Sequence, residues 1–216
     1  MKDIKTLAIV LKRTNYGEAD RILQLITPEG KFSALAKGVR KEKSKLAGSV
    51  EMFSVSEVVL HQGKGDLLIL TGAKMKEFYG SILSDFERLE LASLMLKQMV
   101  KVPEEAGEMF LILQQALSAL DKKYDMDMIM AWFYLNFLRV SGEQMNFLTD
   151  AAGEKLDAET RYNWNRVEQA LEASSSGGIS AAEIKMMRLM WGSPLSLVLR
   201  VKGVDIGEIL KIVKNQ

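Results

Sequence analysis

A dense run of basic side chains lies between residues 31 and 45 of this 216-residue chain. Six of these fifteen residues are lysine or arginine and one, Glu42, is acidic, so the segment carries +5 on a protein whose total charge is +1. Phosphate groups need cations at fixed positions but little directionality, and lysines and arginines on a loop meet that need. The segment therefore predicts binding of a polyanion, with nucleic acid as the first candidate.

Neighbouring residues extend this candidate surface. Gly38 allows a sharp turn, and Val39 and Leu46 are expected to anchor the two ends of the basic loop in the core. Tyr16 stands beside Gly17 in a predicted loop, where its ring could stack on a base. The predicted DNA-binding residues are Lys12, Arg13, Tyr16, Arg21, Lys31, Lys37, Arg40, Lys41, Lys43 and Lys45. The alternative interpretation of such a run is an ordinary solvated face.

Residues suited to catalysis are few. The absence of cysteine excludes thiol nucleophiles, disulfides and thiolate metal sites. His61 is the one histidine, and we expect it at an exposed strand end rather than as a catalytic base. Carboxylates leave a Mg²⁺-dependent nuclease as the one enzymatic alternative, although acids near a helix N-terminus have a structural explanation. Those carboxylates are Glu18 with Asp20, and Asp121 with Asp125 and Asp127. We expect no enzymatic activity, no cofactor and no metal.

Methionine and leucine recur along the second part of the chain. Flexible side chains of this kind can form adaptable grooves for a partner peptide, while packing in a core is the alternative meaning. The predicted partner-binding residues are Met95, Met99, Met186, Met190 and Trp191. Residues 1–80 carry 14 basic and 9 acidic side chains, and residues 81–216 carry 15 and 19, which indicates modules with different partners. A protein-interaction adaptor is therefore the second hypothesis.

Strands must position the basic segment, because alternating apolar residues dominate the first 80 residues. The expected strands are residues 4–13, 20–27, 31–38, 50–61 and 66–78. Thr27-Pro28-Glu29-Gly30 fits a type I turn, and Gln62-Gly63-Lys64-Gly65 fits a hairpin loop. Five short strands in about 80 residues suit a small closed barrel of SH3-like or OB type.

Beyond residue 80 the apolar period becomes helical. The expected helices are residues 84–100, a segment from 104, 126–140, 160–173, 180–191 and 194–214, the last with weak points at Gly203 and Gly207. The predicted fold class is thus α+β, with a five-stranded barrel over residues 1–80 and an all-α helical domain over residues 81–216. No apolar run reaches the length of a membrane span, and Asp3 and Lys5 interrupt any signal sequence, so we expect an intracellular protein.

Five short motifs follow one another with characteristic gaps in the first part of the chain. They are Val10-Leu11, Gly17-Glu18-Ala19-Asp20, Ile26-Thr27-Pro28-Glu29-Gly30-Lys31, Ala36-Lys37-Gly38-Val39-Arg40 and Ser44-Lys45-Leu46. In this order they resemble the N-terminal domain of the bacterial recombination mediator family RecO. The stretch FYGSILSDFERLELASLMLKQMV is similar to the family's first helix after the barrel, so the resemblance covers about residues 4–120.

The resemblance implies an OB-fold that binds single- and double-stranded DNA and anneals complementary strands. It also implies a helical domain that binds the C-terminal tail of single-strand-binding protein, a RecR-type mediator protein as partner, and help in loading the RecA recombinase during DNA repair. A cytoplasmic, nucleoid-associated location goes with these roles. The leading expectation is therefore a non-enzymatic DNA-binding mediator.

One departure from the family concerns metal binding. Many members carry a four-cysteine zinc ribbon in the helical domain, whereas this chain has no cysteine and has residues 141–179 in its place. We expect apolar side chains to hold this region instead of zinc. They are Met145, Phe147, Leu148, Leu156, Tyr162 and Trp164.

Overall fold

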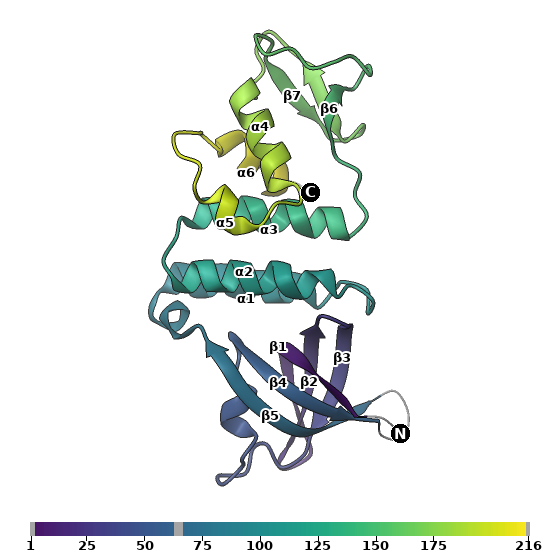
Figure 1. Cartoon of the computed structure of the whole chain (residues 1–216), viewed down its shortest axis with the longest axis vertical. Coiled ribbons are helices and arrows are strands. Elements are labelled where there is room, and N and C mark those ends of the chain that lie inside the picture. The colour runs from purple at the N-terminus through teal and green to yellow at the C-terminus, as the bar shows by residue number, and fades with distance from the viewer. Residues whose placement is uncertain (1–2, 63–66, 215–216) are drawn as a thin grey trace. The chain divides into compact units, whose positions relative to one another are not determined.

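A computed structural model describes residues 3–62 and 67–214, so the hairpin loop predicted at residues 62–65 lies largely outside the described residues. The chain folds into two compact units, residues 1–122 and residues 123–216. Figure 1 shows the strands of the barrel at the purple and blue end of the chain and most of the helices at the green and yellow end. The boundary near residue 80 marks where strands give way to helices, and as a domain boundary it stays a prediction.

Five strands close into a barrel in the first unit. They are β1 (Ile4–Tyr16), β2 (Asp20–Thr27), β3 (Gly30–Ala36), β4 (Ser54–His61) and β5 (Leu68–Phe78). Their order around the barrel is β1-β2-β3-β5-β4, with β3 and β5 parallel and the other pairs antiparallel. This arrangement confirms the predicted five-stranded OB-type barrel.

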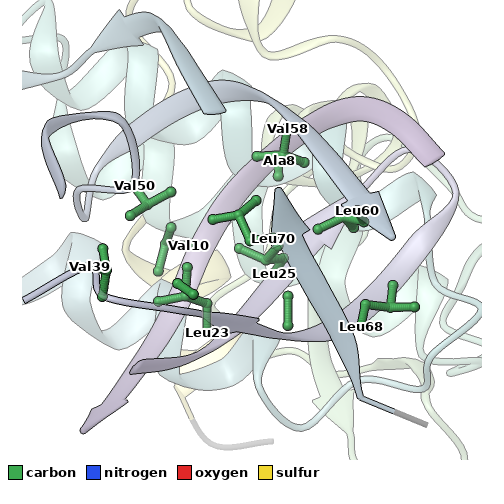
Figure 2. Close-up of a cluster of buried hydrophobic side chains, with 12 residues drawn as sticks. Ala8, Val10, Leu23, Leu25, Val39, Val50, Val58, Leu60, Leu68 and Leu70 are labelled. Carbon is green, nitrogen blue, oxygen red and sulfur yellow. The ribbon is translucent and has the colours of Figure 1, made fainter. Parts of the chain in front are cut away.

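The barrel core comes from side chains at every second strand position, as the alternation of apolar residues predicts. Leu23 and Leu25 of β2 are fully buried and pack with Val10 of β1 and Val58 of β4. Figure 2 shows that Val39 and Val50, at the two ends of the long connection between β3 and β4, also enter this cluster. The connection contains the 3-10 helix η1 (Ala47–Ser49) and is therefore anchored at both ends.

Two helices complete the first unit after the 3-10 helix η2 (Gly80–Ser84). They are α1 (Phe86–Met99), whose N-cap is Asp85, and α2 (Glu108–Asp121). Both contact the barrel strands, α1 at β1 and α2 at β1, β2 and β3. Apolar side chains of one face are buried on each helix, including Met95 and Met99 on α1.

Two glycines allow the turn between β2 and β3 to contact the loop between α1 and α2. A Cβ atom on Gly107 would lie 2.1 Å from the carbonyl oxygen of Pro28, and one on Gly30 would lie 2.2 Å from that of Glu104. The backbone N–H of Lys31 donates to the same Glu104 carbonyl at 2.7 Å. Since only glycine permits such an approach of two backbones, this contact fixes the start of α2 on the barrel.

The second unit combines helices with a small sheet. Its elements are α3 (Met126–Val140), β6 (Asn146–Asp150), β7 (Tyr162–Asn165), β8 (Ala170–Ala173), α4 (Ala181–Met190), α5 (Leu195–Val198) and α6 (Gly207–Lys214). The helix predicted over residues 126–140 is confirmed, with Asp125 as its N-cap, and the capping box at Ser180 begins α4. The prediction of a barrel followed by a helical region holds, with a three-stranded sheet, β6-β8-β7, added to it.

Two of the predicted helices are wrong. Residues 160–173 form β7, a turn and β8, because Tyr162 and Trp164 favour a strand and Gln169 has a positive φ of 49° where the chain reverses. Residues 194–214 form two helices rather than one, since Gly203 has a φ of +74° between α5 and α6.

Candidate nucleic-acid interface

Backbone hydrogen bonds tie the start of the basic segment to the turn between β1 and β2. Gly38 has a φ of +62°, and its N–H donates to the Asp20 carboxylate at 2.7 Å. The N–H of Arg40 donates to the carbonyl of Ala19 at 2.9 Å. Because Val39 between them is buried in the barrel core, the loop leaves the barrel in a defined direction.

Five basic side chains of this loop are exposed to solvent. They are Lys37, Arg40, Lys41, Lys43 and Lys45. Among the described residues, none of the five lies within ion-pair distance of a carboxylate, and Arg40 makes only a long hydrogen bond of 3.4 Å to the Gly17 carbonyl. We therefore find an accessible, uncompensated group of cations on an anchored loop, which we call the basic loop (residues 37–45).

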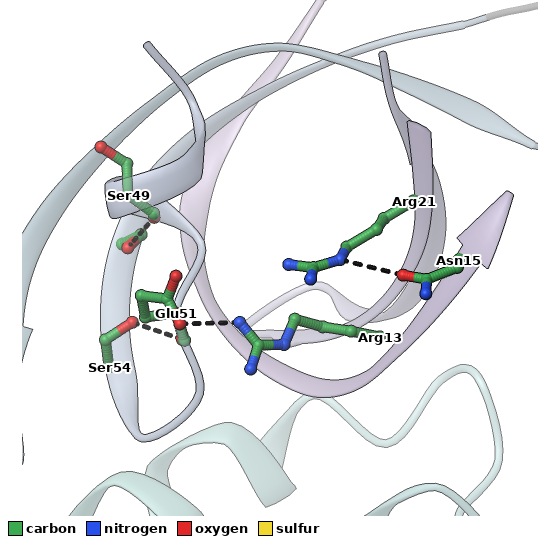
Figure 3. Close-up of polar contacts among 7 residues, drawn as sticks. Arg13, Asn15, Arg21, Ser49, Glu51 and Ser54 are labelled. Carbon is green, nitrogen blue, oxygen red and sulfur yellow. Dashed lines mark hydrogen bonds and ion pairs between the residues drawn. The ribbon is translucent and has the colours of Figure 1, made fainter. Parts of the chain in front are cut away.

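The curved ends of β1 and β2 carry the next group of predicted residues. Figure 3 shows Arg13 and Arg21 extending to the concave side of these strands. Arg13 pairs with Glu51 at 2.7 Å, and the Arg21 guanidinium donates to the Asn15 side chain at 3.3 Å. Tyr16 at the end of β1 is 54% exposed, so its ring is available for stacking. Arg13 is thus partly neutralised, whereas Arg21 and Tyr16 stay accessible beside the basic loop.

Lys31 has a structural contact that the sequence did not reveal. Its ammonium group donates to the carbonyl oxygens of Val100 at 2.8 Å and Val102 at 2.5 Å, at the end of α1. Val100 is the C-cap of α1 and Val102 lies two residues beyond it, and a cation at this position suits the negative end of the helix dipole. We therefore remove Lys31 from the candidate DNA surface and assign it to the attachment of α1 to the barrel.

The predicted partner-binding residues are mostly in the core. Met95, Met99 and Met190 are fully buried and Met186 is 2% exposed, so core packing explains the methionine stripe. Trp191 is half-buried and stacks edge-on against Phe147, with ring centroids 5.5 Å apart. Burial favours packing as the role of the four methionines, and partner binding by these five residues stays a prediction.

Three of the five acidic residues considered for metal binding have hydrogen-bond partners that give them structural roles. Asp20 accepts from Gly38, Asp121 accepts from the N–H of Ser81 at 2.8 Å, and Asp125 caps α3. His61 lies at the end of β4 with its Nδ1 atom 2.7 Å from the Asp3 carboxylate. In the described parts of the chain, no three histidine, aspartate or glutamate side chains gather as metal ligands would.

Supporting residues of the interface were missed by sequence analysis. Sequence analysis considered Asp20 only as a metal ligand. Asp20 and Gly38 each belong to one of the five ordered motifs, and this was the available signal that the two motifs contact each other. Glu51 and Asn15 orient Arg13 and Arg21 but have no motif of their own.

Comparison with known proteins divides the chain near residue 80, where strands give way to helices. Residues 1–79 match the family model "Recombination protein O N terminal", and residues 83–215 match "Recombination protein O C terminal". The chain belongs to the RecO family. It is a member of a DNA repair and recombination family, and its barrel is the family's OB-fold.

Curated RecO proteins align along most of the chain. The DNA repair protein RecO of Dehalococcoides mccartyi is 32% identical over 99% of this chain and 84% of its own length. The protein of the same name from Alkaliphilus metalliredigens is 29% identical over 98% of this chain and 86% of its own length. The family assignment therefore covers both units and not the barrel alone.

The region of residues 141–179, which the sequence predicts in place of a zinc ribbon, offers no thiolate ligands to a zinc ion. It contains no cysteine, and Phe147 instead contacts Trp164 and Trp191 at centroid distances of 5.7 and 5.5 Å. The Arg188 guanidinium donates to the Phe147 carbonyl at 2.7 Å and links the sheet to α4. Aromatic packing thus holds β6 against β7 and the end of α4.

No helix within residues 3–62 and 67–214 has both the length and the apolar character needed to cross a bilayer.

Proposed function

We propose that this RecO family member is a non-enzymatic recombination mediator that binds single- and double-stranded DNA and anneals complementary strands. The observation that carries the proposal is the basic loop, with five exposed cations on a backbone anchored to Asp20 and Ala19. Cations held in this way neutralise the phosphates of two strands together, which lowers their repulsion and lets complementary bases pair.

Charge reversal within the basic loop tests this proposal. We expect the R40E, K41E and K45E triple variant to lose affinity for single-stranded DNA, with the slope of log K against log salt flattened by about 0.7 for each lost phosphate contact. The measurement is fluorescence anisotropy of a labelled oligonucleotide across a salt series. A K74E, K122E and K155E variant, which reverses three exposed lysines elsewhere, is the matched control. Equal affinities of the triple variant and the wild type at low salt would show that the wrong surface has been assigned.

Family membership supports the protein partners and the wider role. We extend the proposal to a RecR-type mediator protein, the C-terminal tail of single-strand-binding protein, and recombinase loading in the cytoplasm at the nucleoid. Calorimetry with an acidic peptide ending in phenylalanine tests the tail interaction, and an absence of heat at high peptide concentration would argue against it.

A further inference from the structure

An apolar hollow of about 460 Å³ lies within the first unit, between β1, the chain before β4 and the second half of α1. Leu11, Met52 and Leu96 form much of its apolar wall, and Lys12, Lys97 and Lys101 also line it. All three lysines are exposed, and none lies within ion-pair distance of a carboxylate in the described part of the chain. The hollow therefore offers apolar contact surface and three uncompensated cations together.

The walls of this hollow are fixed by features already described. The register of β1 shifts between Val10 and Lys12, where a bulge brings Leu11 into the buried wall while Lys12 stays exposed. On the other side, the contact of Lys31 with the carbonyls of Val100 and Val102 holds the end of α1. The two walls thus belong to one rigid arrangement of the barrel and α1.

We propose that this hollow receives one unstacked base of a bound single strand, while Lys12, Lys97 and Lys101 contact the neighbouring phosphates. The proposal rests on the DNA binding proposed above and assigns a second contact region to it. Lys97 and Lys101 were not among the residues that the sequence predicted for DNA binding, so the inference extends the surface from the barrel onto α1.

Charge complementarity favours DNA as the occupant. Lys12, opposite Gln24 of β2, lies with Lys97 and Lys101 around the apolar wall, so three cations are placed to meet the phosphates on either side of one base. An apolar wall contacts the face of a base and makes no hydrogen bonds to its edge. Such contact does not depend on which base is bound, as binding without sequence preference requires. A base held by its face keeps that edge free for pairing with a second strand.

Photo-crosslinking tests where a base lies. An oligonucleotide carrying 5-iodo-deoxyuridine is irradiated with the full-length protein, and the adducts are located by mass spectrometry. We expect adducts in the peptides that contain Met52 and residues 93–101, beside adducts in the basic loop. Adducts confined to the basic loop, with none at the hollow, would overturn the proposal.

Two variants test separately how the lysines and the apolar wall contribute to DNA binding. K97A with K101A should flatten the salt slope by about 1.4, from 0.7 for each lost single-strand contact, whereas the control K74A with K122A should leave it unchanged. M52D should abolish the adduct at the hollow and keep those in the basic loop, and circular dichroism will show whether it folds. An unchanged salt slope in K97A with K101A would overturn the proposal whatever the behaviour of M52D.

The outcomes also distinguish this inference from the proposed function. Failure of the wild type to bind DNA at all would contradict the proposed function itself. A different outcome would assign the hollow to a protein partner. In that case the hollow variants bind DNA like the wild type, and an acidic peptide ending in phenylalanine binds the wild type but not K97A with K101A. The assignment of a base to the hollow would then be wrong.

Discussion

Two lysines of the basic segment, residues 31–45, have different roles in this protein. Lys31 donates to two carbonyls at the end of α1, whereas Lys37, six residues later, is exposed and has no such contact among the described residues. The sequence predicted DNA binding for both lysines, because charge density does not reveal which ammonium group donates to a backbone carbonyl. The structure divides the run into one structural cation and the five cations of the basic loop.

A pair of substitutions separates these tasks. We expect K31M to lower the free energy of unfolding by about 1.5–3 kcal/mol, since it removes two part-buried hydrogen bonds from a charged group. K37M should change stability by less than about 0.5 kcal/mol, as is usual for surface positions, and should weaken DNA binding instead. Urea unfolding and oligonucleotide anisotropy on both variants provide the measurement. A K31M variant with wild-type stability would contradict the structural role.

At the scale of elements, the sequence predicted the strands better than their packing partners. Alternating apolar residues and the turn at Pro28 placed all five barrel strands, because these signals are local. The close approach of Gly30 and Gly107 to opposite backbones joins segments about 75 residues apart, so no local pattern predicts it. Residues 160–173 were predicted as a helix although Tyr162 and Trp164 favour a strand, a local preference that the pairing of β7 with β8 realises.

Substitution of one glycine tests the contact between the turn and the α1–α2 loop. G107A places a Cβ atom 2.1 Å from the Pro28 carbonyl oxygen, so we expect a loss of at least about 2 kcal/mol of stability from overpacking. G48A is the matched control, because its Cβ atom would meet nothing within 4 Å. Thermal or urea unfolding compares the two, and equal stabilities would show that this close approach does not constrain the fold.

Aromatic side chains pack the sheet β6-β8-β7 of the second unit. We expect F147A to destabilise the second unit by about 3–5 kcal/mol, because Phe147 is 4% exposed and contacts two tryptophans. The neighbouring L148A is the control, since Leu148 is 71% exposed. Tryptophan fluorescence follows the unfolding. A chelator should leave the melting temperature unchanged, and a clear fall after EDTA treatment would contradict metal-free packing.

At the scale of the whole molecule, the charge asymmetry has a structural basis. The excess of positive charge in residues 1–80 is concentrated in the basic loop, which the barrel anchors through Val39 and Val50. The methionine stripe of the later residues is explained by burial, so its use as a partner groove could not be judged from spacing alone. Charge density thus predicted the basic loop as a candidate DNA-binding site. Residue spacing could not show whether the methionine stripe is buried or exposed.

The basic loop is proposed to bring two DNA strands together. A strand-annealing assay with complementary oligonucleotides tests it most directly, comparing the wild type, the R40E, K41E and K45E variant, and the K74E, K122E and K155E control. We predict that the wild type and the control accelerate annealing and that the basic-loop variant does not. Annealing at the wild-type rate by the basic-loop variant, or no acceleration by the wild type, would contradict the account.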